Sequence, residues 1–184
     1  MSYPKIFSFK KDYKINLVNE RGEEIQISIH SPTPYIRDNC HRILPDWDSK
    51  LRMSVAIVLQ QSQFTLTESS PRIEAEKHRL RFIFMKFACD VAFDLKDKKY
   101  LTDLIDPRTG YPLLSRPGQI SHDDTAAVKA LLKYPIICNK CRVLIHPEWG
   151  TAVYPSILIS AAPKIIFSQT IQTNAILHGW EQVK

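Results

Sequence analysis

The chain has 184 residues, of which 44% are hydrophobic and 24% charged, and this composition suits one globular domain with a buried core. Its formal net charge is +6, but acidic residues are interleaved with the lysines and no nucleic-acid recognition motif is present, so we expect no nucleic-acid partner. No apolar run approaches the roughly 20 residues needed to span a bilayer, so no membrane partner is expected either.

The N-terminus and the cysteines indicate the compartment. Residues 1–5 contain no apolar stretch of signal-peptide type, and they lack the arginine- and serine-rich pattern of a transit peptide. Four cysteines in a chain of this length do not resemble a secreted disulfide framework. We therefore expect a cytoplasmic protein with reduced thiols. Cys89 lies in a helical apolar pattern and is expected to be a small buried hydrophobic residue.

Alternating apolar residues predict two strands within the first 30 residues, separated by a turn at residues 20–22. The alternating positions are Phe7, Phe9, Tyr13, Ile15 and Leu17 in the first strand, and Ile25, Ile27 and Ile29 in the second. Residues 35–44 then have the pattern of a short helix that ends before Pro45. The mostly apolar run at residues 53–59 has the length of a strand.

A long helix is predicted from about residue 71 to residue 98. Ser70 is a suitable N-cap, and Pro71 follows it at the first helical position. Apolar residues then recur at helical spacing, at Ile73, Leu80, Phe84, Phe87, Val91 and Leu95. This pattern predicts a helix that buries an aromatic-rich stripe.

Shorter elements follow the long helix. Residues 100–105 are expected to form a strand, and Asp-Pro-Arg-Thr-Gly at residues 106–110 is a strong turn signal. Residues 121–133 have a helical pattern with acidic capping residues near its start. We predict that residues 141–145 and 151–160 pair as an antiparallel hairpin around the turn between them.

Strands and helices occur without regular alternation, which predicts an α+β fold with a mainly antiparallel sheet. We treat residues 1–184 as a single domain. Within it, residues 1–24 form an N-terminal strand segment and residues 163–184 a C-terminal extension. Residues 165–167 of that extension are a candidate for a final strand or a docking segment.

Residues 138–151 carry the main chemical signals. Cys138 and Cys141 lie beside the cations Lys140 and Arg142, and a nearby cation favours the thiolate form of a cysteine. A thiolate is both a nucleophile and a soft metal ligand. Strand alternation places Cys141 on the side of its strand that is expected to be buried, so Cys138 is expected to be the more accessible thiol.

Other interpretations of the two cysteines remain open. A zinc site requires two further ligands, for example from Cys40, His41 or His146, because the chain has only one Cys-x-x-Cys motif. A thioredoxin-type redox pair normally lies between a strand and a helix, whereas Cys141 leads into a strand. Two inert thiols are a further interpretation.

Two other groups of residues have a structural and a chemical interpretation. Gly150 can adopt backbone angles that other residues avoid, and His146 in the same turn is expected to be structural. Asp103 and Asp106 could form a carboxylate pair for acid–base catalysis. Asp106 precedes Pro107, however, so a turn-forming role is favoured. No glycine-rich phosphate loop, Gly-x-Ser-x-Gly motif or His-Glu-x-x-His motif is present.

Two segments resemble a known family. Residues 102–110 contain Asp-Leu-Ile-Asp-Pro, and residues 141–151 contain His-Pro-Glu-Trp-Gly-Thr. These motifs resemble those of the methylmalonic aciduria and homocystinuria type D protein family (CblD), which acts in intracellular cobalamin trafficking. The resemblance extends upstream through residues 27–30 and 43–46 and through the long helix, and it covers roughly residues 25–162.

The resemblance implies a fold and a function. The fold implied is the nitroreductase (flavin-reductase-like) α+β fold without a working flavin site. The function implied is that of a non-enzymatic adaptor with no tightly bound cofactor, which meets a CblC-like cobalamin-processing protein. A cysteine of an adjacent Cys-Cys pair in the family supplies a thiolate to the cobalt of cobalamin bound to that partner, and thiolates suit soft metal centres.

This chain departs from the family at the cysteine pair. Aligned on the His-x-x-Trp-Gly-Thr motif, Cys141 matches the second cysteine of the pair, and Lys140 replaces the first. Either Cys141 takes over as the cobalt ligand, or Cys138 does so after a local shift, or the cobalt–thiolate step is absent. We expect six further residues to shape the site: Lys140, Arg142, His146, Trp149, Gly150 and Asp106.

We also expect the protein to be without the long N-terminal extension and organelle leader of the animal proteins. We therefore expect a short, prokaryotic-type homologue that does not sort cobalamin between compartments. Two alternative functions remain. The first is a flavin- or thiol-dependent reductase that acts on a corrinoid or a small disulfide, and the second is a zinc-stabilised interaction module.

Overall fold

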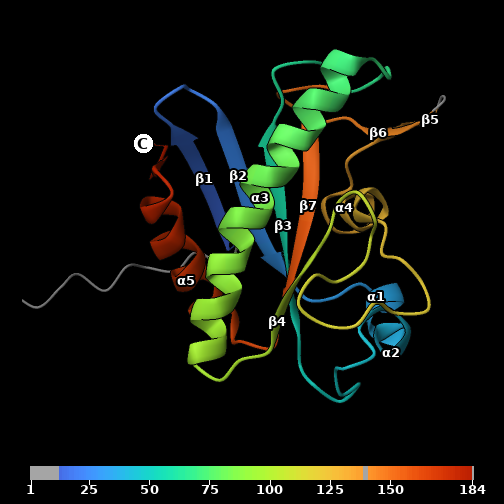
Figure 1. Ribbon diagram of the computed structural model, residues 1–184, viewed down its shortest axis with the longest axis vertical. Helices are drawn as coiled ribbons and strands as arrows, with labels where there is room; N and C mark the ends of the chain where they lie inside the picture. The colour runs from blue at the N-terminus through green and yellow to red at the C-terminus, as the bar shows by residue number, and fades with distance from the viewer. Residues whose placement is uncertain (1–12, 139–140, 184) are drawn as a thin grey trace, which may run out of the picture.

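A six-stranded sheet forms the centre of the computed structural model, which describes residues 13–138 and 141–183 (Figure 1). All neighbouring strands in it are antiparallel, in the order β4-β7-β3-β2-β1-β8. The strands are β1 (Lys14–Asn19), β2 (Glu24–His30), β3 (Ser54–Gln61), β4 (Thr102–Ile105), β7 (Val153–Ser160) and β8 (Trp180–Gln182). A second, two-stranded sheet pairs β5 (Ile136–Cys138) with β6 (Arg142–Leu144). The α+β class and the mainly antiparallel sheet are confirmed.

Helices cover both faces of the large sheet. α3 (Pro71–Asp97) and α5 (Lys164–Leu177) pack on one face, and α3 crosses the front of the sheet in Figure 1. α1 (Pro34–Asp38), α2 (Cys40–Ile43) and α4 (Asp124–Leu132) contribute to the core on the other face.

The two cores follow from the alternation of side chains along the strands. In β3, Ala56 and Val58 point towards α3 and α5, whereas Val55, Ile57 and Leu59 point towards the second core. Because nearly every residue of β3 is buried, its sequence is almost continuously apolar.

The long helix agrees closely with its prediction. The Ser70 side chain accepts a hydrogen bond of 3.3 Å from the Ile73 backbone N–H, and Pro71 begins the helix. The buried stripe contains Leu80, Phe84, Phe87, Val91 and Leu95. Cys89, which we expected to be buried, is only partly so, on the flank of this stripe. No helix in the described ranges combines the length and the apolar character needed to cross a membrane.

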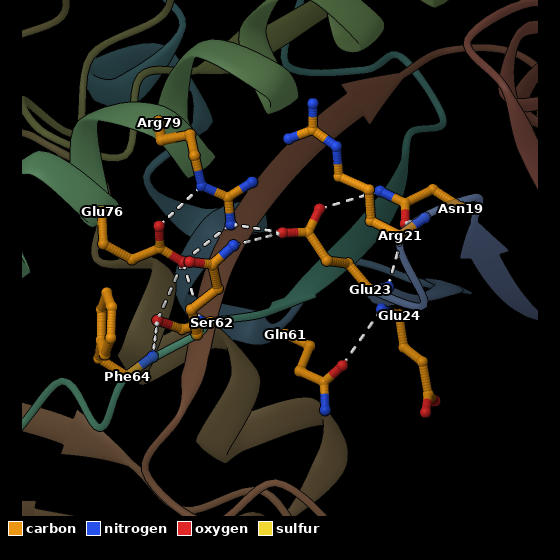
Figure 2. A network of polar contacts seen from close by, with 10 residues as sticks. Asn19, Arg21, Glu23, Glu24, Gln61, Ser62, Phe64, Glu76 and Arg79 are labelled. Atoms are coloured by element: carbon orange, nitrogen blue, oxygen red, sulfur yellow. Dashed lines mark hydrogen bonds and ion pairs between the residues drawn. The ribbon is translucent and has the colours of Figure 1, made fainter.

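A polar network ties the start of α3 to the sheet (Figure 2). Arg79 forms an ion pair of 2.7 Å with Glu76 on the same helix and one of 2.9 Å with Glu23 before β2. Glu76 also accepts a 2.9 Å hydrogen bond from the Gln63 backbone beyond β3. Burial on its own would raise the pKa of Glu76, but these hydrogen bonds outweigh it and lower the pKa. Glu76 is therefore held as a charged, fully paired carboxylate.

Two predicted segments adopt a different structure. The helix expected at residues 35–44 is divided into α1 and α2 at Asn39, whose φ of −106° and ψ of 13° lie outside the helical range. Residues 165–167 lie within α5 rather than in a strand. A run of three apolar residues does not distinguish the two structures, and Phe167 and Ile171, four residues apart, are both buried on one face of the helix.

The predicted hairpin of residues 141–145 with residues 151–160 is wrong. β6 pairs with β5, with Arg142 opposite Cys138. β7 instead lies between β3 and β4 in the large sheet. The apolar side chains of β7 are buried there, in both cores, which a two-stranded hairpin alone does not provide. Phe7 and Phe9, expected in the first strand, lie outside the described residues.

Candidate functional site

An open cavity of about 430 Å³ lies between β6, β7 and the start of α4. Four segments form most of its wall: residues 107–110, 121–125, 141–144 and 153–155. The first and third belong to the two motif segments identified in the sequence, which are more than 30 positions apart. The fold therefore brings both motif segments to one cavity, and this cavity is the candidate functional site.

The Asp106 turn is anchored to the long helix. Arg81 of α3 donates two hydrogen bonds to the Asp106 carboxylate, from Nε to Oδ1 at 2.6 Å and from Nη2 to Oδ2 at 2.8 Å. Asp106 Oδ1 also accepts the Arg108 backbone N–H at 3.0 Å. The hydrogen bonds from Arg81 lower the pKa of Asp106 despite its burial. Asp106 is thus a charged anchor, and its predicted turn-forming role is confirmed.

Asp103 has a separate structural role. Its Oδ1 accepts the backbone N–H groups of Leu113 and Leu114 at 3.0 and 2.9 Å, and its Oδ2 accepts the Ser115 hydroxyl at 2.6 Å. Both Asp103 and Asp106 are therefore fully engaged in holding loops. This arrangement does not support the acid–base pair that the sequence left open.

Gly110 allows the turn to approach the segment before α4. Its φ is +72°, and a Cβ atom at this position would lie 2.5 Å from the His122 carbonyl oxygen. The His122 backbone N–H donates a hydrogen bond of 2.7 Å to the Gly110 carbonyl. Only glycine combines this backbone angle with so close a contact. Gly110 therefore determines where His122 lies.

His122 and Asp124 form a buried pair in the cavity wall. His122 Nδ1 lies 2.8 Å from Asp124 Oδ1, and both residues are more than nine-tenths buried. The second carboxylate oxygen, Asp124 Oδ2, is buried and has no hydrogen-bond partner among the described residues. Burial raises the pKa of Asp124, and the hydrogen bond with His122 opposes this rise.

Tyr154 and Arg108 complete the polar part of the cavity. Burial raises the pKa of the Tyr154 phenol, and the nearby Asp124 carboxylate raises it further, so Tyr154 stays protonated. Arg108 is exposed, and its guanidinium makes no ion pair with any part of the chain that the structure describes.

The two candidate cysteines lie in different environments. Cys141 is partly buried and lines the cavity, whereas Cys138 is exposed on β5 and is not part of the cavity wall. The expectation that Cys138 is the more accessible thiol is confirmed. Arg142, next to Cys141, forms an ion pair with Asp123 at the N-cap of α4. Lys140, the remaining cation expected here, lies outside the described residues.

His146, Trp149 and Gly150 form the turn between β6 and β7 rather than the cavity wall. His146 Nδ1 accepts the Glu148 and Trp149 backbone N–H groups, both at 3.1 Å, and Nε2 lies 2.9 Å from Gln26 Oε1. Burial lowers the pKa of His146, which favours the neutral ring that these bonds require. The Trp149 ring stacks on it at 4.0 Å. The structural interpretation of this histidine is confirmed.

Gly150 has the positive φ that the sequence suggested, at +56°. The ligands needed for the zinc alternative do not come together. Cys40, the first residue of α2, is buried in the second core. Within residues 13–138 and 141–183, no three His, Cys, Asp or Glu side chains are grouped so as to hold a metal ion.

Four residues of the cavity were missed from the sequence: Arg108, His122, Asp124 and Tyr154. The sequence pattern assigned His122 and Asp124 to the start of a helix, and Asp123 is indeed its N-cap, accepting the Ala126 backbone N–H at 2.8 Å. A histidine two positions before an aspartate at a helix start was the available signal. It does not by itself distinguish a capping sequence from a buried pair.

Comparison with protein-family models matches residues 8–172 to the family described as methylmalonic aciduria and homocystinuria type D protein. The matched region contains both motif segments and every segment of the cavity wall. No curated protein matches the chain.

Proposed function

Because the chain belongs to the methylmalonic aciduria and homocystinuria type D protein family, we propose that it is a non-enzymatic adaptor that presents a cysteine thiolate to partner-bound cobalamin. Membership of this family supports a role in cobalamin metabolism. The observation that carries the finer proposal is the position of Cys141, which lies in the cavity wall formed by both motif segments.

Cys141 is the better candidate of the two thiols. It lies directly before β6, next to Arg142, whose ion pair with Asp123 joins this strand to the N-cap of α4. Cys138 lies across the two-stranded sheet, opposite Arg142, and outside the cavity wall. A cysteine that binds the cobalt of a bulky corrinoid must be held in place by its neighbours and must also remain accessible from solvent. Cys141 meets both conditions, because it is partly buried and lines an open cavity. Through this ion pair, Arg142 holds β6, and with it the neighbouring Cys141, against the start of α4.

The proposed step is a ligand exchange. The Cys141 sulfur would form a bond to the cobalt, the water molecule that occupied that coordination position would leave, and the thiol proton would pass to solvent. No electron is transferred, and the cobalt keeps its oxidation state. A soft thiolate suits this metal centre. The chain contributes the sulfur and its position, and the partner, a CblC-like processing protein, holds the cobalamin.

We propose the nitroreductase-like fold and a cytoplasmic location on the same family grounds. The mainly antiparallel sheet and the single long helix support the fold. A reductase that uses the Cys141 thiol or a bound flavin is the competing function. Flavin absorbance in the purified protein, or turnover of a corrinoid or a small disulfide, would support that alternative.

The test is an ultraviolet–visible titration of aquacobalamin with the reduced chain, with and without the processing partner. We expect a cobalt–thiolate band in the wild type and in Cys138→Ser, and its loss in Cys141→Ser. The Cys138→Ser variant is the matched control, because it also removes one thiol from the same hairpin. A band that survives in Cys141→Ser would overturn the assignment.

A further inference from the structure

The outer face of α3 has the pattern of a helix that meets a second helix. The inner face of α3 packs on the sheet, and the outer face points towards the viewer in Figure 1. Four residues follow one another along the outer face at spacings of four, three and four positions: Phe82, Lys86, Cys89 and Phe93. Phe82 is 70% exposed and Phe93 is 49% exposed. Alternating steps of three and four positions are the heptad spacing of residues that pack against another helix.

A hollow of about 520 Å³ opens beside Phe93, between α3 and α5. Its apolar side is formed by Phe93 and by Leu177, which is 75% exposed. Phe82 lies eleven positions before Phe93, and therefore about 16 Å away along the axis of the helix. One face of the molecule thus carries both a projecting aromatic ring and a recess with an apolar side.

Two charged side chains lie between the Phe82 ring and Phe93. Lys86 makes no ion pair with residues 13–138 or 141–183. Asp90 Oδ2 lies 2.8 Å from His178 Nε2, but the Asp90 side chain is still 53% exposed. In a parallel pair of α3 helices, each of these charges would face its own copy and be repelled. In an antiparallel pair a lysine faces an aspartate, so the two charges favour the antiparallel arrangement.

We propose that two copies of this chain associate through α3, as an antiparallel pair of helices related by a two-fold axis. An axis between positions 87 and 88 brings Phe82 of each copy opposite Phe93 of the other, beside the hollow. The same axis brings Lys86 within one position of Asp90 of the other copy. Each contact then occurs twice, as an isologous interface requires. A second copy is therefore the occupant that matches the ring, the hollow and both charges together.

The first test is sedimentation equilibrium of the unmodified full chain under reducing conditions. The chain is measured between about 1 and 200 µM, the range in which an interface of modest area associates. We expect the average mass to rise with concentration from the 21.2 kDa of one chain towards twice that value. A mass that stays at 21.2 kDa over the whole range would overturn the inference.

The second test removes the projecting ring. Phe82→Ser is expected to raise the dissociation constant of the dimer about a hundredfold, because an aromatic anchor is lost twice across the two-fold axis. Tyr35→Ser is the matched control, since it also removes an exposed aromatic ring, but from α1 on the opposite face of the sheet. It should leave the dissociation constant unchanged. A dimer that is as stable in Phe82→Ser as in the control would contradict the proposed contact.

The third test exchanges the two charges. Lys86→Glu and Asp90→Lys are each expected to weaken association about tenfold, because like charges then face one another twice. The double variant again places opposite charges across the axis, and it should recover most of the lost affinity. Asp90→Lys also breaks the contact with His178 within one chain, which the exchange cannot repair, so the recovery reports on the interface. A double variant that associates as weakly as Lys86→Glu would overturn the antiparallel arrangement.

The processing partner is the other candidate occupant of this face. If the chain alone stays monomeric and Phe82→Ser lowers its affinity for that partner, the face belongs to the partner and the inference of a second copy fails. The inference does not rest on the proposed function, because none of the four residues on the outer face lines the cavity beside Cys141. Phe82→Ser should therefore lose the dimer and keep the cobalt–thiolate band.

Discussion

The carbonyl oxygen of Gly110 accepts a 2.7 Å hydrogen bond from the backbone N–H of His122, and this contact joins the Asp106 turn to the start of α4. The cavity beside Cys141 lies between these two segments. The shape of the cavity therefore depends on a hydrogen bond between two backbone groups, in which no side chain takes part. The first prediction concerns this contact.

Gly110→Ala is expected to destabilise the protein more than Gly22→Ala. Both glycines have a positive φ, +72° at Gly110 and +74° at Gly22, so alanine at either position carries about 1–2 kcal/mol of backbone strain. Only at Gly110 does the added Cβ also collide with backbone, 2.5 Å from the His122 oxygen, whereas nothing lies within 4 Å at Gly22. Urea unfolding of the two variants measures the difference. Equal losses would show that the turn can move away without cost.

Asp106→Asn is expected to lower the free energy of unfolding by about 1.5–3 kcal/mol, the range for hydrogen bonds to a charged group. The substitution breaks the two-fold contact with Arg81 and leaves a partly buried guanidinium poorly paired. Asp46→Asn is the matched control, because its ion pair with Arg116 is exposed and is expected to contribute little. If Asp46→Asn were as destabilising as Asp106→Asn, the anchoring role of Asp106 would not hold.

Stability is expected to fall as the pH drops below the ordinary carboxyl range of about 4. The pKa values of Glu76 and Glu23 are lowered in the folded protein. Burial alone would raise both, but hydrogen bonds from Arg79 and the Gln63 backbone outweigh it at Glu76, and hydrogen bonds from Asn19, Gln63 and Arg79 outweigh it at Glu23. A lowered folded pKa contributes stability above the unfolded pKa, and this contribution is lost as the pH falls towards the folded value.

The check is thermal unfolding between pH 3 and 7 for the wild type and Glu76→Gln. The variant should be less stable at neutral pH and should lose less stability on acidification. If the wild type instead became more stable as the pH fell through this window, the pH dependence of its stability would have the opposite sign to the prediction. This result would rule out the network of Figure 2 as the source of the pH dependence.

His146→Ala is expected to cost about 2–3 kcal/mol, because it leaves buried polar groups without partners. The ring accepts two backbone N–H groups, contacts Gln26 and stacks on Trp149. Its effect should be on stability alone, since His146 does not line the cavity. His41→Ala, at an exposed position, is the control. Loss of the cobalt–thiolate band in folded His146→Ala would place this turn in the site after all.

The sequence correctly predicted the helices and strands whose signals all lie within one continuous segment of the chain. α3 has its cap, its proline and its apolar stripe within one continuous segment, and β2 has a clear alternation of isoleucines. The pairing of β7 could not be read in this way, because its partner β3 is about a hundred positions away in the chain. Residues 141–145 and 151–160 are neighbours in sequence, and that nearness favoured a hairpin that does not form.

The candidate site was predicted only in part. The sequence singled out Cys141, Arg142 and the Asp106 turn, and these residues do lie at or beside the cavity. It also grouped His146, Trp149 and Gly150 with them, although their turn packs against Gln26 of β2. The buried pair of His122 and Asp124 depends on the close approach of Gly110, which is visible only in three dimensions.

The most direct test is X-ray absorption at the cobalt edge in a complex of the reduced chain, its processing partner and aquacobalamin. The account predicts a sulfur atom in the first coordination shell of cobalt for the wild type and for Cys138→Ser. In Cys141→Ser, only nitrogen and oxygen ligands should remain. A wild-type complex whose cobalt has no sulfur ligand would contradict the proposal that Cys141 presents a thiolate to cobalamin.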